Sequence, residues 1–287
     1  MLNEGRDVAR HCAVWGSPIG HSLSPVLHRA AYAALGLHDW SYDRREVDEA
    51  GFAAALAGLD ATWVGLSLTM PLKEAAFRSA TTVTTLAAVT GAANTLVRDP
   101  DGSPGWTAHN TDVHGITMAL RVAGCTDLSS VLVVGSGATA RAAIAAVSAP
   151  RGRVVFMVRD RVRPETLAQA RQAGLAVEVV HLGEWATAAD VDAVVSTVPP
   201  ASVPGLGSFP EASEGSRRPV VLDVVYGSGE TALQRAARDR GWAVAAGTDM
   251  LLHQATEQVR LMTGRPAPLA EMSHALRLAL RDRREDP

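Results

Sequence analysis

The sequence has few cysteines, one lysine and three asparagines, and it lacks any long apolar run. Cys12 and Cys125 are too few for a disulfide framework, and no Cys/His spacing resembles a zinc site. No apolar stretch reaches the roughly 18–20 residues that a membrane span needs. The 27 basic and 30 acidic residues give a net charge of −3, so no basic excess favours nucleic acid or anionic lipid. We therefore expect a soluble, cytoplasmic protein without a metal, a membrane partner or a nucleic-acid partner.

Length and composition are those of a two-domain globular protein. At roughly 100–200 residues per domain, 287 residues suggest two domains. Hydrophobic residues make up 47% and charged residues 20%, which excludes the disordered class. The first ten residues mix charged and apolar positions without the apolar core of a secretory signal, so we expect no targeting segment there.

Strand-like and helix-like segments alternate along the chain. From Ser130 onward the alternation is regular, and strands flanked by helices imply a parallel sheet that is covered on both faces. Two amphipathic helices are expected at the end, over Leu251–Met262 and Pro268–Arg281. The other expected helices begin near Ser24, Glu49, Pro71, Asp112, Gly137 and Glu165. Strands are expected at Cys12–Trp15, Trp40–Val47, Trp63–Leu68, Asn94–Val97, Val131–Val134, Val154–Val158, Val177–His181, Ala193–Thr197, Val220–Val224 and Trp242–Ala245.

A glycine-rich turn joins the apolar strand Val131–Val134 to an alanine-rich helix. It reads Gly135-Ser136-Gly137-Ala138-Thr139-Ala140 and fits the G-x-G-x-x-G/A pattern of dinucleotide-binding folds in the required context. Gly135 would permit the tight turn, Gly137 a close approach of backbone to a pyrophosphate, and Ala140 close packing of helix on strand. The helix N-terminus would hold the pyrophosphate. The alternative is a glycine-rich turn that binds nothing.

The end of the next strand favours NADP over NAD. NAD-binding proteins usually place an acidic residue there, about 20 residues after the glycines, to hold the ribose 2′-hydroxyl. This chain has Val158 at that position, followed by Arg159, which could stack on adenine and pair with a 2′-phosphate. Asp160 comes next and keeps NAD open as the less favoured cofactor. Arg161 and Arg163 could equally be solvated surface charges.

Lys73 is the only lysine among the 27 basic residues, and it lies in the segment Ser67-Leu-Thr69-Met-Pro71-Leu-Lys73. A single lysine is normally a solvated surface charge. This chain, however, uses arginine for its surface charge, and arginine cannot lose its proton in a protein whereas lysine can. Lys73 is therefore a candidate for a position where a proton must come and go.

Other short polar segments carry unusual residues. Ser22 and Ser24 precede an expected helix, where two hydroxyls could cradle a carboxylate, although Ser24 could simply cap the helix. Asn94 offers a donor and an acceptor, which suits sugar-like hydroxyls. Asp112 begins an expected helix and could be a cap, but a carboxylate beside Lys73 would also hold its ammonium group in place.

Taken together, these segments resemble the shikimate dehydrogenase family. The matching stretches follow the family's order and spacing over nearly the whole chain. They are GSPIGHSLSP, SLTMPLK, GAANTL, HNTDVHG, VVGSGATARA, DVVY (Asp223–Tyr226) and GTDMLLHQA (Gly247–Ala255).

The resemblance implies an α/β fold with two domains. A substrate-binding domain with a mixed sheet would span residues 1–111 and 247–287, because the C-terminal helices return to the first domain. A Rossmann-type, doubly wound parallel sheet over residues 112–246 would bind NADP. The implied activity is the reversible reduction of 3-dehydroshikimate to shikimate with NADPH in aromatic (chorismate) biosynthesis. The implied partners are these small molecules, and the protein would be a monomer or homodimer.

The resemblance also implies roles for individual residues. Lys73 would be the general acid/base, paired with Asp112. Ser22 and Ser24, assisted by Tyr226, would bind the substrate carboxylate. Gly135 to Ala140 would hold the pyrophosphate and Arg159 the 2′-phosphate. The ring hydroxyls would be bound by Thr69, Asn94, Asp112 and Gln254, and the nicotinamide would lie near Gly247 and Met250.

Some positions depart from the family pattern and leave alternatives open. The family often has Asn-Arg-Thr where this chain has Val158-Arg159-Asp160, which bears on the choice of NADP. Ala138 stands where a third glycine is usual, and Ser67 replaces a common asparagine, so no substrate contact is carried over to it. One alternative is a sister enzyme that uses quinate or an aminoshikimate with NAD. Another is a non-catalytic regulator that binds shikimate-like ligands on the same fold.

Overall fold

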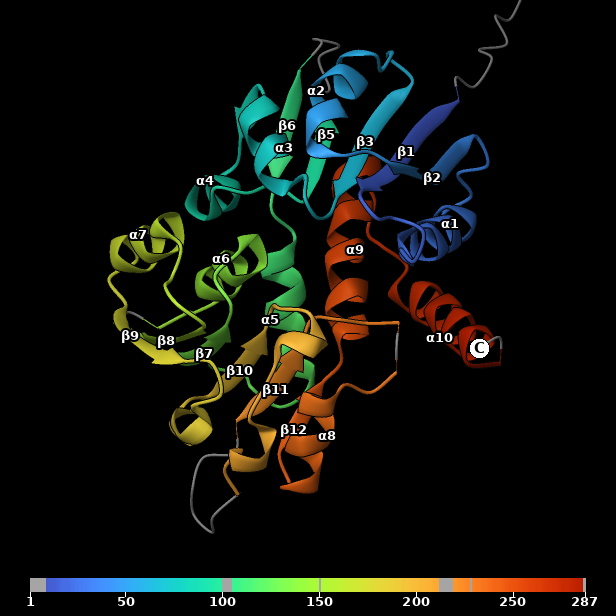
Figure 1. The fold of residues 1–287 in the computed structure, drawn as a ribbon. Coiled ribbons are helices and arrows are strands. Elements are labelled where there is room, and N and C mark those ends of the chain that lie inside the picture. Colours follow the sequence, from blue (N-terminus) through green and yellow to red (C-terminus); the bar gives the residue numbers. More distant parts are fainter. Residues whose placement is uncertain (1–8, 100–104, 150, 212–218, 228, 286–287) are drawn as a thin grey trace, which may run out of the picture. The chain divides into compact units, whose positions relative to one another are not determined.

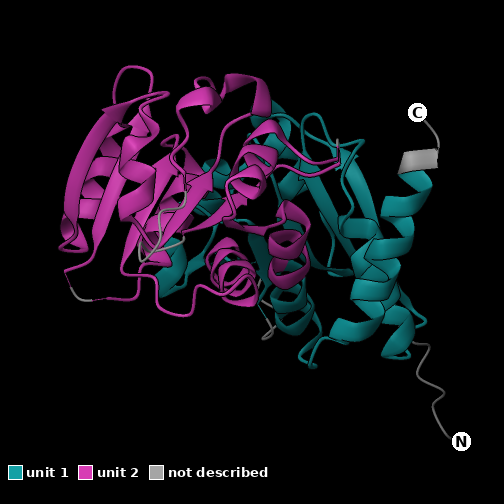
Figure 2. Cartoon of the chain, turned by 90° about the horizontal axis from the view of Figure 1, so that it is seen from below, with its two compact units in different colours: residues 1–88, 92–111, 255–287 teal, residues 89–91, 112–254 magenta. Residues whose placement is uncertain are grey.

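The structure is a computed structural model that describes residues 9–99, 105–149, 151–211, 219–227 and 229–285. Most of the first ten residues, where no targeting segment is expected, lie outside the described residues. The chain folds into two compact units. Unit 1 comprises residues 1–88, 92–111 and 255–287, and unit 2 comprises residues 89–91 and 112–254 (Figure 2).

Unit 1 is built on a mixed sheet of six strands in the order β2-β1-β3-β5-β6-β4 (Figure 1). β1 pairs in parallel with β2 and with β3, whereas β5 is antiparallel to β3 and to β6. The strands are β1 (Arg10–Gly16), β2 (Trp40–Glu46), β3 (Trp63–Leu68), β4 (Thr82–Val83), β5 (Thr95–Arg98) and β6 (Trp106–His109).

The helices of unit 1 cover both faces of this sheet. The chain moves from β1 outward to β2 and then back to β3, so right-handed crossovers place the two connecting helices on opposite faces. Phe52 and Leu56 of the second helix pack in one core with Trp15 and Leu66. The helices are α1 (Ser24–Ala34), α2 (Glu49–Ala57), α3 (Lys73–Ser79), α4 (Thr85–Thr90) and α10 (Leu269–Glu285).

Helix α9 (Gly247–Thr263) is shared, because residues up to Gln254 belong to unit 2 and the rest to unit 1. In unit 1 its last turns pack on β3, where a Cβ on Gly65 would lie 2.5 Å from Met262 Cγ. Arg265, just after α9, donates to the carbonyl of Leu35 at 3.0 Å, and Arg283 of α10 donates to that of His21 at 3.0 Å. The two arginines thus bind the C-terminal segment to the residues on either side of α1.

Unit 2 has a parallel sheet of six strands in the order β12-β11-β10-β7-β8-β9, the doubly wound arrangement. Strand β7 is buried on both faces: Val131 and Val133 join one core cluster, and Leu132 and Val134 the other. The strands are β7 (Ser130–Val134), β8 (Arg153–Val158), β9 (Ala176–His181), β10 (Ala193–Ser196), β11 (Val220–Asp223) and β12 (Ala243–Ala245). The helices are α5 (Asp112–Val122), α6 (Ala138–Ala145), α7 (Pro164–Gln172) and α8 (Ala232–Asp239), with short 3-10 turns at Trp185–Asp190, Pro200–Ser202 and Leu206–Ser208.

The predicted fold class is confirmed: an α/β protein with one mixed sheet, one doubly wound parallel sheet and C-terminal helices that return to the first unit. Several element limits were wrong or missing. Helix α9 begins at Gly247 rather than Leu251, α3 begins at Lys73 rather than Pro71, and α4, α8 and β6 were not expected. Within the described residues, no helix combines the length and the apolar character that crossing a bilayer requires.

The predicted domain limits and the division seen in the structure differ in two places. The sequence assigns residues 89–91 and 247–254 to the substrate-binding domain, whereas in the structure these residues pack with unit 2. A Cβ on Gly115 of α5 would lie 2.7 Å from the carbonyl of Met250, so the first turns of α9 lie directly against α5. The assignment of substrate to one domain and of nucleotide to the other stays a prediction.

Candidate functional site

The carboxyl ends of β1 and β3 lie side by side in unit 1. Thr69 donates its backbone N–H to the carbonyl of Trp15 at 3.0 Å, and Ser17 donates its own to that of Met70 at 3.0 Å. A Cβ on Gly16 would lie 2.9 Å from the Met70 carbonyl, so only glycine fits. The helix that follows β1 and the helix that follows β2 lie on opposite faces of the sheet. The direction of the chain therefore reverses at this edge, and α/β sheets commonly bind ligands at such topological switch points.

Ser22 and Ser24 follow β1 at this edge and are both buried, at 4% and 5% exposure. The expectation that Ser24 caps the helix was wrong, because α1 begins with Ser24 and no side chain caps it at Leu23. Ser22 Oγ instead accepts the N–H of Ser24 at 3.3 Å. The Ser22 hydroxyl therefore orders the first turn, and the two serines stay predicted ligands of a carboxylate.

Lys73 is the first residue of α3, just beyond the carboxyl end of β3, and its side chain is partly buried. Its carbonyl accepts the N–H of Ala93 at 2.9 Å, and the N–H of Leu68 donates to the carbonyl of Asn94 at 2.7 Å. These two backbone bonds hold the start of α3 beside the segment that leads into β5. The only lysine of the sequence and Asn94 are therefore neighbours within unit 1.

Asn94 is 2% exposed and is bonded to Thr111. Asn94 Oδ1 accepts the backbone N–H of Thr111 at 2.8 Å, and Asn94 Nδ2 donates to Thr111 Oγ1 at 2.9 Å. Asp112 is the next residue in the chain, the first of α5, and it is 4% exposed. Lys73 belongs to unit 1 and Asp112 to unit 2, and the pairing of their side chains stays a prediction.

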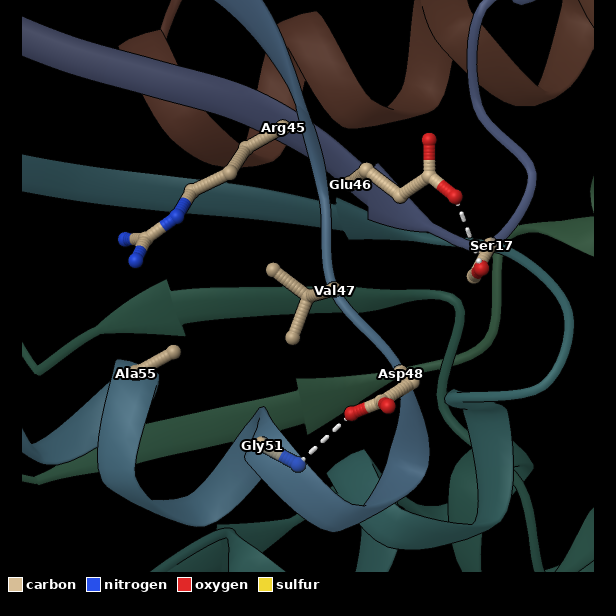
Figure 3. A pocket seen from close by; sticks show the side chains of 7 residues that line it. All are labelled: Ser17, Arg45, Glu46, Val47, Asp48, Gly51 and Ala55. Carbon is tan, nitrogen blue, oxygen red and sulfur yellow. Dashed lines mark hydrogen bonds between the residues drawn. The ribbon is translucent and has the colours of Figure 1, made fainter.

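A cavity of about 350 Å³ lies beside this edge in unit 1 (Figure 3). Ser17 Oγ donates to Glu46 Oε1 at 3.0 Å on one side of it, and Asp48 accepts the N–H of Gly51 at 2.8 Å on the other. Its charged side chains are exposed, and it contains none of the predicted site residues. It therefore does not mark the candidate site.

The glycine-rich turn of unit 2 has the geometry that its sequence predicts. Gly135 has a φ of +104°, and a Cβ there would lie 2.7 Å from Thr197 Oγ1, so the turn requires glycine. A Cβ on Gly137 would meet nothing within 4 Å, and no side chain caps α6 at this residue. Ala140 is fully buried in the core. Ser136, Ala138 and Thr139 complete the turn, which presents the uncapped start of α6, as a pyrophosphate site requires.

The loop after β8 is tied to this turn. Ser136 Oγ accepts the backbone N–H of Arg163 at 3.3 Å, and Thr166 Oγ1 donates to the carbonyl of Ser136 at 2.7 Å. Arg159 and Asp160 lie exposed in the same loop. These bonds hold the end of that loop against the glycine turn, and the contact of Arg159 with an adenosine ribose or its 2′-phosphate stays a prediction.

The carboxyl end of β11 packs on the start of α9 in unit 2. A Cβ on Gly247 would lie 2.6 Å from the carbonyl of Val225, which makes glycine necessary there. Asp223 is fully buried, and burial raises its pKa above the ordinary value, partly offset by hydrogen bonds that include one from Thr231. Its Oδ1 accepts the N–H of Val225 at 3.4 Å and so helps hold the turn that carries Tyr226.

Met250 and Gln254 follow in α9 and are both buried, at 7% exposure. Gln254 Nε2 donates to the carbonyl of Leu251 at 3.0 Å, within its own helix. Tyr226 is partly buried. Among the described residues, no group of three or more His, Cys, Asp or Glu side chains is arranged to hold a metal ion.

Sequence reasoning missed a second set of buried polar residues in unit 1. Gln258 is 1% exposed, and its side chain bonds to groups from two strands, β3 and β5, and from α1. A glutamine one helical turn after Gln254 was the available signal, since a buried glutamine needs partners. The other members of the set are His28, Tyr42, Ser67, Thr95 and Thr111.

The fold and the site define a two-unit α/β protein with a dinucleotide-binding type of turn in one unit. A model of the shikimate dehydrogenase substrate binding domain matches residues 14–96, and one of the shikimate 5'-dehydrogenase C-terminal domain matches residues 247–277. A shikimate dehydrogenase (NADP(+)) of Moorella thermoacetica is 37% identical over 280 residues, covering 93% of this chain and 92% of the relative. The chain belongs to the shikimate dehydrogenase family.

Solved structures give the same result. The shikimate dehydrogenase of Mycobacterium tuberculosis is 36% identical and superimposes with a TM-score of 0.78, covering 94% of this chain and 99% of that one. The enzyme from Thermus thermophilus, solved in complex with NADP(H) and shikimate, is 29% identical with a TM-score of 0.77. That match covers 94% of this chain and 99% of the other.

Proposed function

We propose that this protein catalyses the reversible, NADPH-dependent reduction of 3-dehydroshikimate to shikimate, a step of chorismate and aromatic amino-acid biosynthesis. The observation that carries the proposal is the position of the only lysine. Lys73 begins a helix at the carboxyl end of β3, and its carbonyl is bonded to Ala93, beside Asn94. The chain that carries this lysine is similar in sequence, over 93% of its length, to a shikimate dehydrogenase (NADP(+)).

Lys73 and Asp112 would carry the proton chemistry. NADPH, when bound, supplies a hydride to the ketone carbon of the substrate. Negative charge then develops on the ketone oxygen, and the Lys73 ammonium stabilises it and donates a proton from Nζ, which completes the alcohol. In the reverse direction the neutral amine accepts that proton. Asp112 would hold the ammonium in place, and general acid catalysis of this kind typically contributes about 10²–10⁴-fold.

Substrate recognition would come from the polar groups around Lys73. Ser22 and Ser24 would bind the carboxylate, assisted by Tyr226. The burial of both serines supports this role, because a hydrogen bond to a carboxylate is stronger when water is excluded. The ring hydroxyls would be bound by Thr69, Asn94, Asp112 and Gln254.

The nucleotide would bind at the glycine turn of unit 2. The uncapped start of α6 and the open space at Gly137 fit a pyrophosphate, with Gly135 to Ala140 as its cradle. Arg159, in the loop tied to Ser136, would pair with the 2′-phosphate. Gly247 and Met250 would lie near the nicotinamide. NADP is the cofactor of the curated relatives, and Asp160 is the reason to test NAD as well.

Further expectations concern the roles of the two units, the location, the oligomeric state and the partners. Unit 1 would bind the substrate and unit 2 the nucleotide. The protein would work in the cytoplasm, as a monomer or a homodimer, on small molecules rather than on nucleic acid or a membrane.

A matrix of steady-state rates tests the proposal. The purified protein is assayed by absorbance of the reduced nicotinamide with shikimate, quinate and an aminoshikimate, each with NADP and with NAD. We expect the highest kcat/KM for shikimate with NADP. A preference for quinate, for the amine or for NAD would instead identify a sister enzyme. Calorimetric binding of shikimate without any change in absorbance would identify a non-catalytic regulator.

A further inference from the structure

The chain between β1 and α1 makes a tight turn that presents Ser22. Ser22 donates its backbone N–H to the carbonyl of Ile19 at 3.0 Å, which closes the turn over residues 19–22. Its hydroxyl oxygen accepts the N–H of Ser24 at 3.3 Å, and a hydroxyl that accepts one bond can still donate its proton. A carboxylate offers only acceptors, so Ser22 would meet it as a donor whose place is set by the turn.

Two arginines bond the carbonyls of the two residues that precede Ser22. Arg44 of β2 donates to the carbonyl of Gly20, and Arg283 of α10 donates to that of His21 at 3.0 Å. One arginine comes from the N-terminal sheet and the other from the last helix, and both belong to unit 1 (Figure 1). The turn is therefore held at successive residues by donors from two different elements.

Packing fixes the elements that carry these arginines. Helix α10 packs along α1, and its residues Met272 and Leu276 are buried. Strand β2 pairs in parallel with β1, and Val47, just after β2, donates its N–H to the carbonyl of Gly16 at 3.0 Å. The backbone on either side of the turn and the elements that carry both arginines thus belong to one packed structure.

The bond from Arg283 and the bond that closes the turn share one peptide group. The carbonyl of that group belongs to His21 and accepts from Arg283, and its N–H belongs to Ser22 and donates to Ile19. A guanidinium at the carbonyl polarises the peptide group, so its N–H becomes a better donor and the two bonds strengthen each other. The loss of Arg283 would therefore loosen the turn at Ser22 itself.

We propose that Arg44 and Arg283 are positioning residues that hold the turn over residues 19–22, so that the Ser22 hydroxyl is fixed for the carboxylate of the substrate. Each arginine acts through a backbone carbonyl rather than through a contact with the substrate. The inference rests on the proposed function, because it takes Ser22 as a ligand of that carboxylate.

This arrangement has a consequence for the recognition of charge. A hydrogen bond to a carboxylate is shorter and about twice as strong as one to an uncharged group, and it weakens steeply when the donor is misplaced. A displaced turn therefore weakens the binding of a carboxylate more than that of an uncharged ester. The proton transfer at Lys73 is not altered, so the KM should change while kcat does not.

Arg283→Met tests the proposal, and Arg265→Met is the matched control. Arg265 also donates to a backbone carbonyl at 3.0 Å, that of Leu35 at the other end of α1. Both changes remove one cation and one bond from the C-terminal segment, but only Arg283 bonds the turn. Arg283→Lys restores a charged donor and serves as the rescue variant. Each protein is assayed with shikimate and with shikimate methyl ester, whose acid group carries no charge.

We expect Arg283→Met to raise the KM for shikimate by about 3- to 10-fold, the effect of one lost hydrogen bond, without a change in kcat. The KM for the methyl ester should change much less, so the preference for shikimate decreases. Arg44→Met should give the same pattern, Arg283→Lys should recover most of the wild-type KM, and Arg265→Met should keep it. Equal changes for both substrates, an equal rise of KM in Arg265→Met, or an unchanged KM in Arg283→Met would overturn the inference.

Amide hydrogen exchange gives a second readout, which does not depend on activity. The backbone N–H of Ser22 is bonded to Ile19, so its exchange in ¹⁵N-labelled protein reports whether the turn is closed. We expect exchange at least about 3-fold faster in Arg283→Met than in the wild type, and the wild-type rate in Arg265→Met. Unchanged exchange in Arg283→Met would contradict the proposal. If the wild type does not oxidise shikimate, the proposed function fails, and this measurement still decides whether Arg283 holds the turn.

Discussion

The backbone N–H of Thr111 donates to Asn94 Oδ1 at 2.8 Å, and Thr111 directly precedes Asp112. The same asparagine accepts the N–H of Leu68 on its own carbonyl, five residues before Lys73. Asn94 is thus hydrogen-bonded to the backbone just before each predicted catalytic residue, at Leu68 before Lys73 and at Thr111 before Asp112. A substitution at Asn94 would disturb both, so the role of Lys73 is better tested at Lys73 itself.

Replacing Lys73 by alanine should lower turnover while the protein stays folded. The proton donor is lost, and general acid catalysis is typically worth about 10²–10⁴-fold, so kcat should fall by that factor. Steady-state kinetics with shikimate and NADP measure the effect, and thermal unfolding checks the fold.

Arg78→Ala is the matched control for that change. Arg78 lies on the same helix, is exposed, and pairs with Glu49 on the surface at 3.0 Å. Its loss should leave kcat at the wild-type value. Near-normal turnover of Lys73→Ala would remove Lys73 from its proposed role.

The single lysine permits a chemical test. An amine-directed reagent can label only Lys73 and the N-terminal amine. Saturating shikimate should slow the labelling of Lys73 by at least about 10-fold, because the bound substrate would cover the amine. Mass spectrometry of the digested protein measures both sites, and the N-terminus serves as the internal reference. Equal labelling of Lys73 with and without shikimate would contradict its place in the site.

Replacing Arg159 by alanine should weaken NADP binding specifically. A hydrogen bond between charged groups contributes about 1.5–3 kcal/mol, so the KM for NADP should rise roughly 10- to 100-fold while that for NAD changes little. Steady-state kinetics with both cofactors measure the split. Arg171→Ala, which changes an exposed cation at the end of α7, is the control. A parallel rise for both cofactors would show that Arg159 does not read the 2′-phosphate.

Local sequence signals predicted most of the fold and the outline of the candidate site. The run Val131–Val134 is buried on both faces, so its continuous apolar character indicated a covered parallel strand. The positive φ of Gly135 follows from the glycine pattern itself. The family motifs supplied the return of the last helices to the first unit, which periodicity could not show.

The buried hydrogen bonds of Gln258 could not be predicted because its partners lie far from it in the sequence. Gln258 bonds Ser67 and Thr95, each more than 160 residues away. Neither pattern nor propensity indicates which buried polar groups meet when the chain returns to an earlier sheet. The start of α9 was missed because a glycine usually indicates the end of a helix. Gly247 instead lies in the first turn of α9, where close packing against the Val225 carbonyl leaves no room for a side chain.

The stability of the protein should decrease at acid pH in a way that His28 governs. Burial, opposed by the hydrogen bond to Gln258, lowers the pKa of His28 from 6.5 to about 3. Between these values the unfolded chain binds a proton that the folded chain does not, so the free energy of unfolding decreases as the pH falls through the window. The slope from this group is at most about 1.4 kcal/mol per pH unit.

Urea unfolding at several pH values between about 6.5 and 4 measures this slope. His28→Leu removes the titrating group, so its slope should be shallower than that of the wild type by roughly 1 kcal/mol per pH unit, even if its stability at neutral pH is lower. His38→Leu changes an exposed histidine in the turn after α1 and should keep the wild-type slope. Equal slopes for the wild type and His28→Leu would show that His28 already binds its proton in the folded protein within this range.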